Sequence, residues 1–371
     1  MTTGRRPIIG VALEPFGWHP AAFAETGGEA AEATSGRHWT ALTRAAEDAG
    51  ADLATFEDSF TLTARDRLSG RLDAALLAAR VAPATHRIGL VPSVTVTHTE
   101  PFHTSKAVAS LDHISGGRGG VRPQVTESAA ARALFGRAPQ RDRETLLREA
   151  ADYVHVLRDL WDSWDDDAVI RDAASGRYVD RERLHYIDFE GEFFSVKGPS
   201  ITPRPPQGQP VVALRVTDDD EARLAARSAD LVFAPVTSDH DAAATRDRLD
   251  DAGIGAGTPV LADVTVFLAD SERTAVRRLA KLDRREPSAD DTLVYAGTGA
   301  GLRALLEEWQ AVGIDGARIR PAVNAVDLPR LAEALAPLPP PESGTLRARL
   351  GLRTPVHRFA SPSPSTSRNE P

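Results

Sequence analysis

Short β-branched runs alternate with longer amphipathic segments along the whole chain, and this alternation constrains the fold more than any other feature of the 371 residues. Alternating strands and helices predict a parallel α/β fold, and eight strands fit a (β/α)8 TIM barrel better than an open sheet. The eight runs are IIGVAL from Ile8, DLATFED from Asp52, RIGLVPSV from Arg87, GGVRPQV from Gly119, PVVALRV from Pro210, DLVFAPV from Asp230, VLADVTVFL from Val260 and GARIRPAV from Gly316.

Apolar residues at three-and-four spacing predict helices between these runs. The predicted helices cover residues 38–49, 71–80, 101–113, 144–161, 219–228, 271–282 and 302–312. The glycine-rich stretch SLDHISGGRGGVRP, residues 110–123, has the order helix, glycines, strand. A phosphate loop needs the opposite order, because its free amides lie at the start of a helix. We therefore expect Gly116 and Gly117 to end a helix in the left-handed conformation, away from the ligand site.

One barrel domain is predicted for residues 1–340, and an insertion at 162–209 separates its fourth and fifth strands. The stretch FEGEFFSVKGPSI in this insertion is typical of a hairpin. Insertions of this size shape an active-site mouth or are purely structural, and we expect this one beside the mouth, where it would limit substrate size. Residues 341–371 form an extension whose last part, rich in Ser and Pro, is expected to be disordered.

Charge and cysteine content exclude several function classes. The net charge of -9 comes from 44 basic and 53 acidic residues mixed along the chain, which argues against nucleic-acid and membrane partners. Without cysteine there can be neither disulfides nor thiolate metal sites nor a cysteine nucleophile. The first apolar run is too short for a secretory signal, so we expect a cytoplasmic protein, acting on a small molecule and forming a homo-oligomer.

Barrel active sites lie at the carboxyl ends of the strands, and this rule selects the candidate residues. They are His19, Asp58, Ser93, Thr95, Arg122, Gln124, Thr126, Arg215 and Thr217. The strand ends hold no cluster of two histidines and a carboxylate, so no metal site is predicted, and there is no G-x-S-x-G nucleophile elbow. Hydroxyl and amide groups around a wide mouth suit a planar organic cofactor that brings its own chemistry.

Several candidates have a second interpretation. His19 follows GW in a loop, where it is either a proton-transfer group or a structurally bonded side chain. Asp58 either lines the site or caps the next segment. Ser93 and Thr95 lie on a strand end with Thr97, where side chains alternate between the lumen and the helices. A metal-free lyase or hydrolase would need a lysine or paired carboxylates in the lumen, and the strand ends offer no lysine.

Seven stretches spread over nearly the whole chain carry a family resemblance. They are GWHPAAF, GADLATFEDSF, HRIGLVPSVTVTHTEPFHTSKAVASLDHISGGRGG, LWDSWDDDAVIRDAASGRY, DFEGEFFSVKGPSITPRPPQGQPVV, AARSADLVF and VGIDGARIRP. Through them the chain resembles the luciferase-like flavin-dependent monooxygenases, in particular the nitrilotriacetate, alkane and sulfone monooxygenase branch. The resemblance implies a (β/α)8 barrel with insertions, reduced FMN or its F420-type deazaflavin counterpart as a loosely held cosubstrate, a separate flavin reductase, and oxygen insertion into a small organic substrate.

The same resemblance assigns positions around the cofactor. It places Asp58, Ser93, Thr95 and the strand from Arg122 through Gln124 to Thr126 around the flavin ring. It places His19 facing the ring from the first strand. The family holds the flavin phosphate at the turn after the fifth strand, which here contains Arg215 and Thr217.

This turn departs from the family pattern, and so does one strand position. Val216, Thr217 and Asp218 stand where the family has Gly, Ser and Ser, and Asp219 and Asp220 follow. Carboxylates suit a helix N-terminus but repel phosphate, at a cost of about 4 kcal/mol for one charge about 4 Å away at an effective dielectric of about 20. Arg215 offsets part of this cost. The family's usual tryptophan is replaced by Val121.

These departures lead us to expect weak FMN binding. They also keep open a second function, that of a non-catalytic or flavin-deficient homologue acting as a binding or partner subunit. The stretch YAGTGAG, residues 295–301, is the other place with the order strand, glycine, helix, and it is the alternative position for a phosphate.

Overall fold

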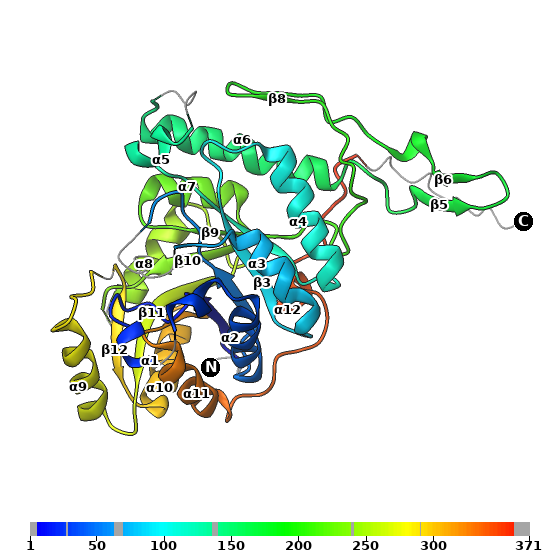
Figure 1. The fold of residues 1–371 in the computed structure, drawn as a ribbon. Coiled ribbons are helices and arrows are strands. Elements are labelled where there is room, and N and C mark those ends of the chain that lie inside the picture. Colours follow the sequence, from blue (N-terminus) through cyan, green and yellow to red (C-terminus); the bar gives the residue numbers. More distant parts are fainter. Residues whose placement is uncertain are drawn as a thin grey trace, which may run out of the picture.

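Parallel strands close on themselves around a buried lumen in the computed structural model, which describes residues 6–26, 29–62, 70–135, 140–238, 241–289 and 291–359 (Figure 1). Each of the eight predicted runs contains one strand of the barrel, and β1 pairs with both β2 and β13, which closes it. The predicted TIM barrel is confirmed. In barrel order the strands are β1 Ile8–Leu13, β2 Leu53–Phe56, β3 Gly89–Thr95, β4 Gly120–Gln124, β9 Val211–Arg215, β10 Leu231–Pro235, β11 Val260–Leu268 and β13 Gly316–Pro321.

A further parallel strand, β12 (Leu293–Gly297), is not one of the eight predicted barrel strands, although the order strand, glycine, helix assigned to residues 295–301 implies a strand here. It pairs with the carboxyl half of β11, from Val264 to Leu268, whereas β10 pairs with the first half, from Val260 to Asp263. The neighbour of β11 therefore changes from β10 to β12 toward the carboxyl end of the barrel.

All seven predicted helices are present with shifts of a few residues at their ends. Five others among the described residues were not predicted. Of these, α1, α5 and α12 have only four or five residues, α8 is mostly polar, and α11 contains Pro329. The helices are α1 Phe23–Thr26, α2 Gly36–Asp48, α3 Ala74–Val81, α4 Pro101–Ser115, α5 Ala129–Ala133, α6 Arg143–Trp161, α7 Asp219–Ser228, α8 Asp241–Asp251, α9 Glu272–Asp283, α10 Gly299–Ala311, α11 Asn324–Leu335 and α12 Leu346–Arg349. None of them, in the described ranges, is long and apolar enough to cross a membrane.

The glycine-rich stretch ends a helix, as its residue order predicts. Gly116 caps α4 in the left-handed conformation, with φ 66° and ψ 46°. The amide of Gly117 donates to the carbonyl of Asp112 at 2.9 Å. Both glycines lie at the amino end of β4, which is the end of the barrel away from the predicted ligand site.

The insertion contains two hairpins, and its position differs from the prediction. The predicted hairpin is β7 (Phe189–Glu190) with β8 (Ser195–Val196), and a second one pairs β5 (Val169–Asp172) with β6 (Arg177–Val179). The insertion follows α6 rather than a strand, so both its ends lie at the amino end of the barrel, where Gln209 donates to Asp162 at 2.6 Å. Helix-to-strand connections lie at this face, opposite the active-site mouth.

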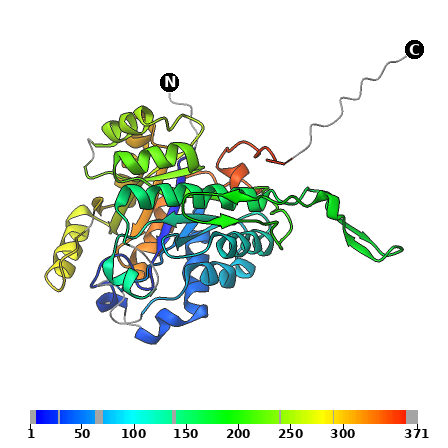
Figure 2. The ribbon, with the colours of Figure 1, turned by 90° about the horizontal axis from the view of Figure 1, so that it is seen from above.

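The two hairpins extend in different directions from this base. The β5–β6 hairpin projects away from the barrel (green, right of Figure 2). The β7–β8 hairpin runs back along α6. There the Phe194 ring packs edge-on against the Tyr153 ring, with 6.4 Å between the ring centres. The prediction that the insertion lies beside the mouth is therefore wrong for its ends. The tip of the β7–β8 hairpin, however, reaches the start of α6, at the mouth end of this helix, where the Arg141 guanidinium lies 4.9 Å from the centre of the Phe193 ring.

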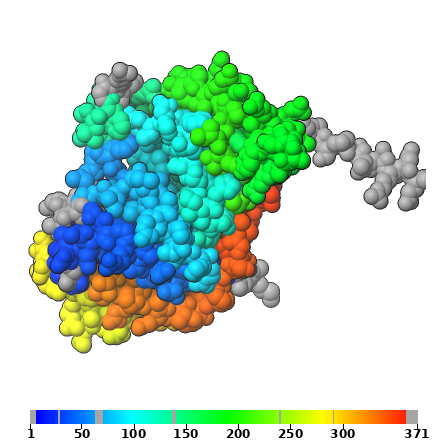
Figure 3. All heavy atoms as spheres, turned by 45° about the vertical axis from the view of Figure 1, so that its right-hand side comes forward, coloured from blue at the N-terminus to red at the C-terminus, as the bar shows by residue number. Residues whose placement is uncertain are grey.

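Residues after 340 close the amino end of the barrel. Leu346 and Leu350 are buried among the first residues of the strands, including Ile8, Leu53 and Val211. Arg347 pairs with both oxygens of Asp230 at 3.1 and 2.9 Å. Figure 3 shows the following segment (orange to red) against the insertion (green), where His357 contacts the carbonyl of Trp164 at 3.0 Å. The predicted disorder of the last part concerns residues 360–371, which lie outside the described residues.

Leu346→Ala should cost about 2–5 kcal/mol of the free energy of unfolding, because it leaves a cavity in a closely packed site. The packing is so close that a Cβ on Gly89 would lie 2.5 Å from the Leu346 side chain. Urea unfolding followed by circular dichroism measures the loss. Val356→Ala is the control, since Val356 is 86% exposed and its truncation should change stability by less than about 0.5 kcal/mol. Equal effects of the two variants would mean that α12 does not belong to the barrel core.

Candidate active site at the barrel mouth

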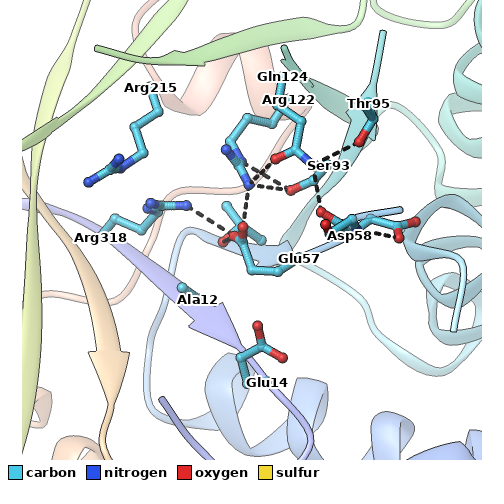
Figure 4. A network of polar contacts seen from close by, with 12 residues as sticks. Ala12, Glu14, Glu57, Asp58, Ser93, Thr95, Arg122, Gln124, Arg215 and Arg318 are labelled. Carbon is cyan, nitrogen blue, oxygen red and sulfur yellow. Dashed lines mark hydrogen bonds and ion pairs between the residues drawn. The ribbon is translucent and has the colours of Figure 1, made fainter. Parts of the chain in front are cut away.

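A layer of polar side chains spans the carboxyl ends of β3 and β4. Ser93 lies opposite Arg122 in the strand register, and Thr95 lies opposite Gln124. Because side chains alternate along a strand, all four lie on the same face, toward the lumen. Arg122 donates to the Ser93 hydroxyl at 3.0 and 2.6 Å and to the Gln124 side-chain carbonyl at 3.1 Å. We call Ser93, Thr95, Arg122 and Gln124 the polar layer (Figure 4).

Asp58 joins this layer through its backbone. The Gln124 amide donates to the Asp58 carbonyl at 2.5 Å and to the Thr95 hydroxyl at 3.0 Å. The Asp58 carboxylate accepts from the amides of Ser59 at 2.7 Å and Ala74 at 2.9 Å. Burial raises the pKa of this carboxyl above its usual value. The structure thus brings five predicted residues together, namely Asp58, Ser93, Thr95, Arg122 and Gln124.

Glu57 lies beneath the polar layer, between two guanidinium groups. It pairs with Arg122 and accepts from Arg318 at 3.1 Å (Figure 4). Burial opposes its ionisation, but the charges of Arg122 and Arg318 outweigh burial and lower the pKa of Glu57 to about 2. Burial also lowers the pKa of Arg122, to about 10. Both partners are therefore charged at neutral pH.

Asp263 on β11 organises the rest of the lumen. This carboxylate is fully buried and accepts from Arg215 at 2.8 Å, from Arg318 at 2.6 and 2.9 Å, and from Arg320 at 2.6 Å. Burial opposes its ionisation, but the guanidinium groups around it hold the pKa of Asp263 well below its usual value. Asp291 is a second carboxylate beside these arginines, and it accepts hydrogen bonds from Arg215 at 2.6 Å and from Arg320 at 3.0 Å.

The residue selection at the strand ends did not include Asp263, Arg318 and Arg320, which lie within β11 and β13. A signal for them was nevertheless present. Arg318 and Arg320 are two residues apart in GARIRP, which places them on the same face of a strand. A pair of arginines inside an otherwise apolar run indicates a charged lumen with carboxylate partners.

Two cavities adjoin the polar layer, on opposite sides of it. The larger, about 410 Å³, lies toward α3 and α4 and is lined by residues that include Asp58, Phe60, Asp73, Ser93, Thr95 and Glu100. The smaller, about 200 Å³, lies between β4, β9, α6 and α7 and reaches from Arg122 to Thr217 and Glu221. Only the larger has the volume typical of ligand pockets, about 300–1,000 Å³.

His19 is not part of this group. It is 2% exposed, its Nε2 lies 3.0 Å from Asp283, and its Nδ1 accepts from the amide of Ala21 at 3.1 Å. Its ring packs edge-on against the Phe267 ring, with 5.8 Å between the ring centres. It lines neither of the two cavities. These contacts favour a structural role, and a role of His19 in catalysis stays a prediction.

Thr126 and Arg215 also make internal contacts. The amide of Thr126 donates to the Thr97 hydroxyl at 3.0 Å, which joins the loops after β3 and β4. Arg215 is held by Asp263 and Asp291, so its charge is compensated within the lumen rather than directed at the turn that follows β9.

The α7 turn, residues 216–221, does not fit a phosphate. Asp218 accepts from the amide of Glu221 at 2.9 Å, and Glu221 accepts from the amide and hydroxyl of Thr217 at 2.8 and 2.7 Å. Arg143 is shared among Asp218, Glu221 and Glu127. The donors that would hold a phosphate are thus engaged by carboxylates of the chain itself, whereas the polar layer has the hydrogen-bonding groups that suit a flavin ring.

Comparisons with known proteins agree with this architecture. Residues 16–318 match the family model described as luciferase-like monooxygenase. N-acetyl-S-(2-succino)cysteine monooxygenase of Bacillus subtilis (strain 168) is 32% identical over 237 residues, which cover 63% of this chain and 54% of the relative. Nitrilotriacetate monooxygenase component A of Aminobacter aminovorans is 31% identical over 294 residues, which cover 74% and 65%. The chain spans about half to two thirds of the length of these relatives.

Solved structures show the same fold. EDTA monooxygenase from Chelativorans sp. BNC1 superimposes with a TM-score of 0.82 at 21% identity, covering 94% of this chain and 99% of that one.

Proposed function

Because the chain belongs to the luciferase-like monooxygenase family, we propose that it is a flavin-dependent oxidoreductase or monooxygenase that oxidises a small organic substrate with a reduced flavin and oxygen. The observation that carries this proposal is the polar layer beside a ligand-sized cavity at the carboxyl ends of the strands. A bound flavin, FMN or alternatively an F420-type deazaflavin, would supply the redox chemistry.

In this proposal each residue of the mouth has a defined task. The hydroxyls of Ser93 and Thr95 bind the polar edge of the flavin ring, Gln124 holds Thr95 and the Asp58 carbonyl in place, and Arg122 keeps a fixed positive charge beneath the ring. Glu57 stays ionised, since its pKa is about 2, so it anchors Arg122 and transfers no proton near neutral pH. Asp58 lines the larger cavity and has a raised pKa, which makes it the carboxyl best placed to exchange a proton with a bound substrate.

A separate flavin reductase is part of the same proposal. The nitrilotriacetate relative is named component A, which supports a system of more than one protein. The homo-oligomer and the cytoplasmic location stay predictions from the sequence.

Flavin titration tests the proposed function. Purified protein should quench the fluorescence of at least one flavin in a saturable way, and Gln124→Leu should weaken binding about tenfold or more. Leucine lacks the amide that holds Thr95 and the Asp58 carbonyl in place, and we expect this loss to weaken the free energy of flavin binding by about 1.4 kcal/mol or more. Thermal unfolding checks that the variant is folded, and Ser110→Ala on α4, which loses only a bond within its own helix, is the control. Absence of saturable quenching with FMN, riboflavin and a deazaflavin would refute the proposal.

The α7 turn favours a second candidate, a flavin-deficient homologue that serves as a partner subunit. Its carboxylates accept the amides of the turn at which the family resemblance places the flavin phosphate. The same titration separates the two functions, because a partner subunit binds no flavin and retains only its association with another protein.

A further inference from the structure

We infer that this protein selects a flavin without a phosphate group, so that riboflavin binds at least as tightly as FMN. The inference rests on the proposed function, since it requires a flavin ring at the polar layer. Three separate features of the described residues carry it, and they are the two helix N-termini at the barrel mouth and the lining of the larger cavity.

The first feature is the charge of the α7 turn. Asp218 caps α7, and Asp219, Asp220 and Glu221 form its first turn. Arg143 pairs with Asp218 and Glu221 at this turn, and its hydrogen bonds, that to Glu127 first, hold its pKa above the usual value. Arg223 pairs with Asp220, and Arg248 donates to the Thr217 carbonyl. Removing Arg143 from Asp218, Glu221 and Glu127 to bind a phosphate would leave these three carboxylates without their shared guanidinium. The turn therefore repels a phosphate rather than binding it.

The second feature is the N-terminus of α10, the other turn with the order strand, glycine, helix. Thr298 caps this helix and accepts from the amide of Gly301 at 3.1 Å. The Tyr295 hydroxyl donates to the Thr298 carbonyl at 2.9 Å and would lie only 2.5 and 2.2 Å from a Cβ on Gly297 and Gly301. The glycines thus make room for the tyrosine ring, which covers this helix end and leaves no cradle for an anion.

The third feature is the lining of the larger of the two cavities that adjoin the polar layer. It contains the carboxylates of Asp58, Asp73 and Glu100, and among the described residues no arginine or lysine lines it. His103 is the one lining side chain that can carry a positive charge. A phosphate would be repelled here, whereas the terminal hydroxyl of a riboflavin side chain can donate a hydrogen bond to a carboxylate.

Together these features oppose a phosphate wherever the ligand's side chain leaves the polar layer. On the β9 side it would meet Glu221 and Thr217, because the charges of Arg122 and Arg215, which also line that cavity, are compensated by Glu57, Asp263 and Asp291. On the β3 side it would meet the three cavity carboxylates. The uncharged side chain of riboflavin meets no such repulsion on the β9 side or on the β3 side. Selection against the phosphate is thus built into the rim of the barrel, independently of the ring contacts.

Parallel titrations with riboflavin and FMN, followed by fluorescence and by calorimetry, test the inference. Riboflavin should bind with a dissociation constant equal to or lower than that of FMN. Raising the salt concentration should tighten FMN binding relative to riboflavin, because it screens the repulsion. The double variant Asp218→Asn, Glu221→Gln should tighten FMN binding about tenfold or more and leave riboflavin unchanged, since it frees Arg143. Glu272→Gln, in the first turn of α9, removes a charge at another helix start and should change neither affinity.

The outcomes separate this inference from the proposed function. FMN binding tenfold tighter than riboflavin would overturn the inference and leave the flavin-dependent activity standing. Equal affinities that do not respond to the double variant would also overturn it, because the phosphate would then lie in solvent. Binding of neither flavin would refute the proposed function itself.

Discussion

Asp263→Asn is expected to lower the free energy of unfolding by about 3–5 kcal/mol, the cost of removing one charge from a buried ion-pair network. Asp263 is fully buried and accepts hydrogen bonds from Arg215, Arg318 and Arg320, so the amide leaves three guanidinium groups without this shared carboxylate. Urea unfolding at neutral pH, followed by tryptophan fluorescence, measures the loss. If the variant does not accumulate as folded protein, Asp263→Glu is measured instead. It keeps the negative charge, so its loss of unfolding free energy reflects only the changed position of the carboxylate.

Asp291→Asn provides a matched control for this prediction. Asp291 pairs with Arg215 and Arg320, two of the same arginines, but its side chain is 58% exposed. Solvent screens such a pair, so the loss should be about 1 kcal/mol or less. If both variants lost the same stability, the two carboxylates would be interchangeable, and burial in the lumen would not determine the strength of the network.

The ion pairs that Asp263 and Glu57 make in the lumen also explain which polar groups are available at the mouth. The charges of Arg215 and Arg318 are compensated below the polar layer, by Asp263 and by Glu57. Arg122 connects the polar layer to the ion pairs below it, because it pairs with Glu57 and donates hydrogen bonds to Ser93 and Gln124. The stability of the barrel and the orientation of the proposed ring-binding groups therefore depend on the same side chains.

Most of the fold could be predicted from the sequence, because buried parallel strands are β-branched and their helices are amphipathic. β12 was not counted among the strands of the sheet, since its residues are only partly buried and it does not complete the barrel. The ends of the insertion were misplaced for a different reason. Its length indicates a functional position, but the element before it decides the face on which it lies, and that element is the helix α6.

The candidate site was predictable only where polar residues end strands. That rule found Asp58, Ser93, Thr95, Arg122 and Gln124, which the structure brings together. It also selected His19, which strand order places near the mouth but whose two ring nitrogens are engaged elsewhere. Sequence position could not show these pairings, because they join residues far apart in the chain, such as His19 and Asp283.

The ionisation of Glu57 predicts how stability depends on pH. The pKa of Glu57 is about 2 in the folded protein, against an ordinary value of 4.5, because Arg122 and Arg318 outweigh its burial. A carboxyl with a lowered pKa stabilises the folded state fully above its unfolded pKa. This contribution, about 3 kcal/mol for a shift of this size, is lost as the pH falls from about 5 to about 2.

Glu57→Gln should therefore be less stable than the wild type by about 3 kcal/mol at neutral pH, and the difference should shrink as the pH falls through this window. Other carboxyls titrate in both proteins, so their effects cancel in the difference. Chemical unfolding at several pH values between 2 and 7 gives the curve, and Glu182→Gln, at an exposed position of the insertion, should run parallel to the wild type. A constant difference between Glu57→Gln and the wild type down to pH 2 would show that the loss comes from packing rather than from charge. The pairing of Glu57 with Arg122 would then not fix the guanidinium beneath the polar layer.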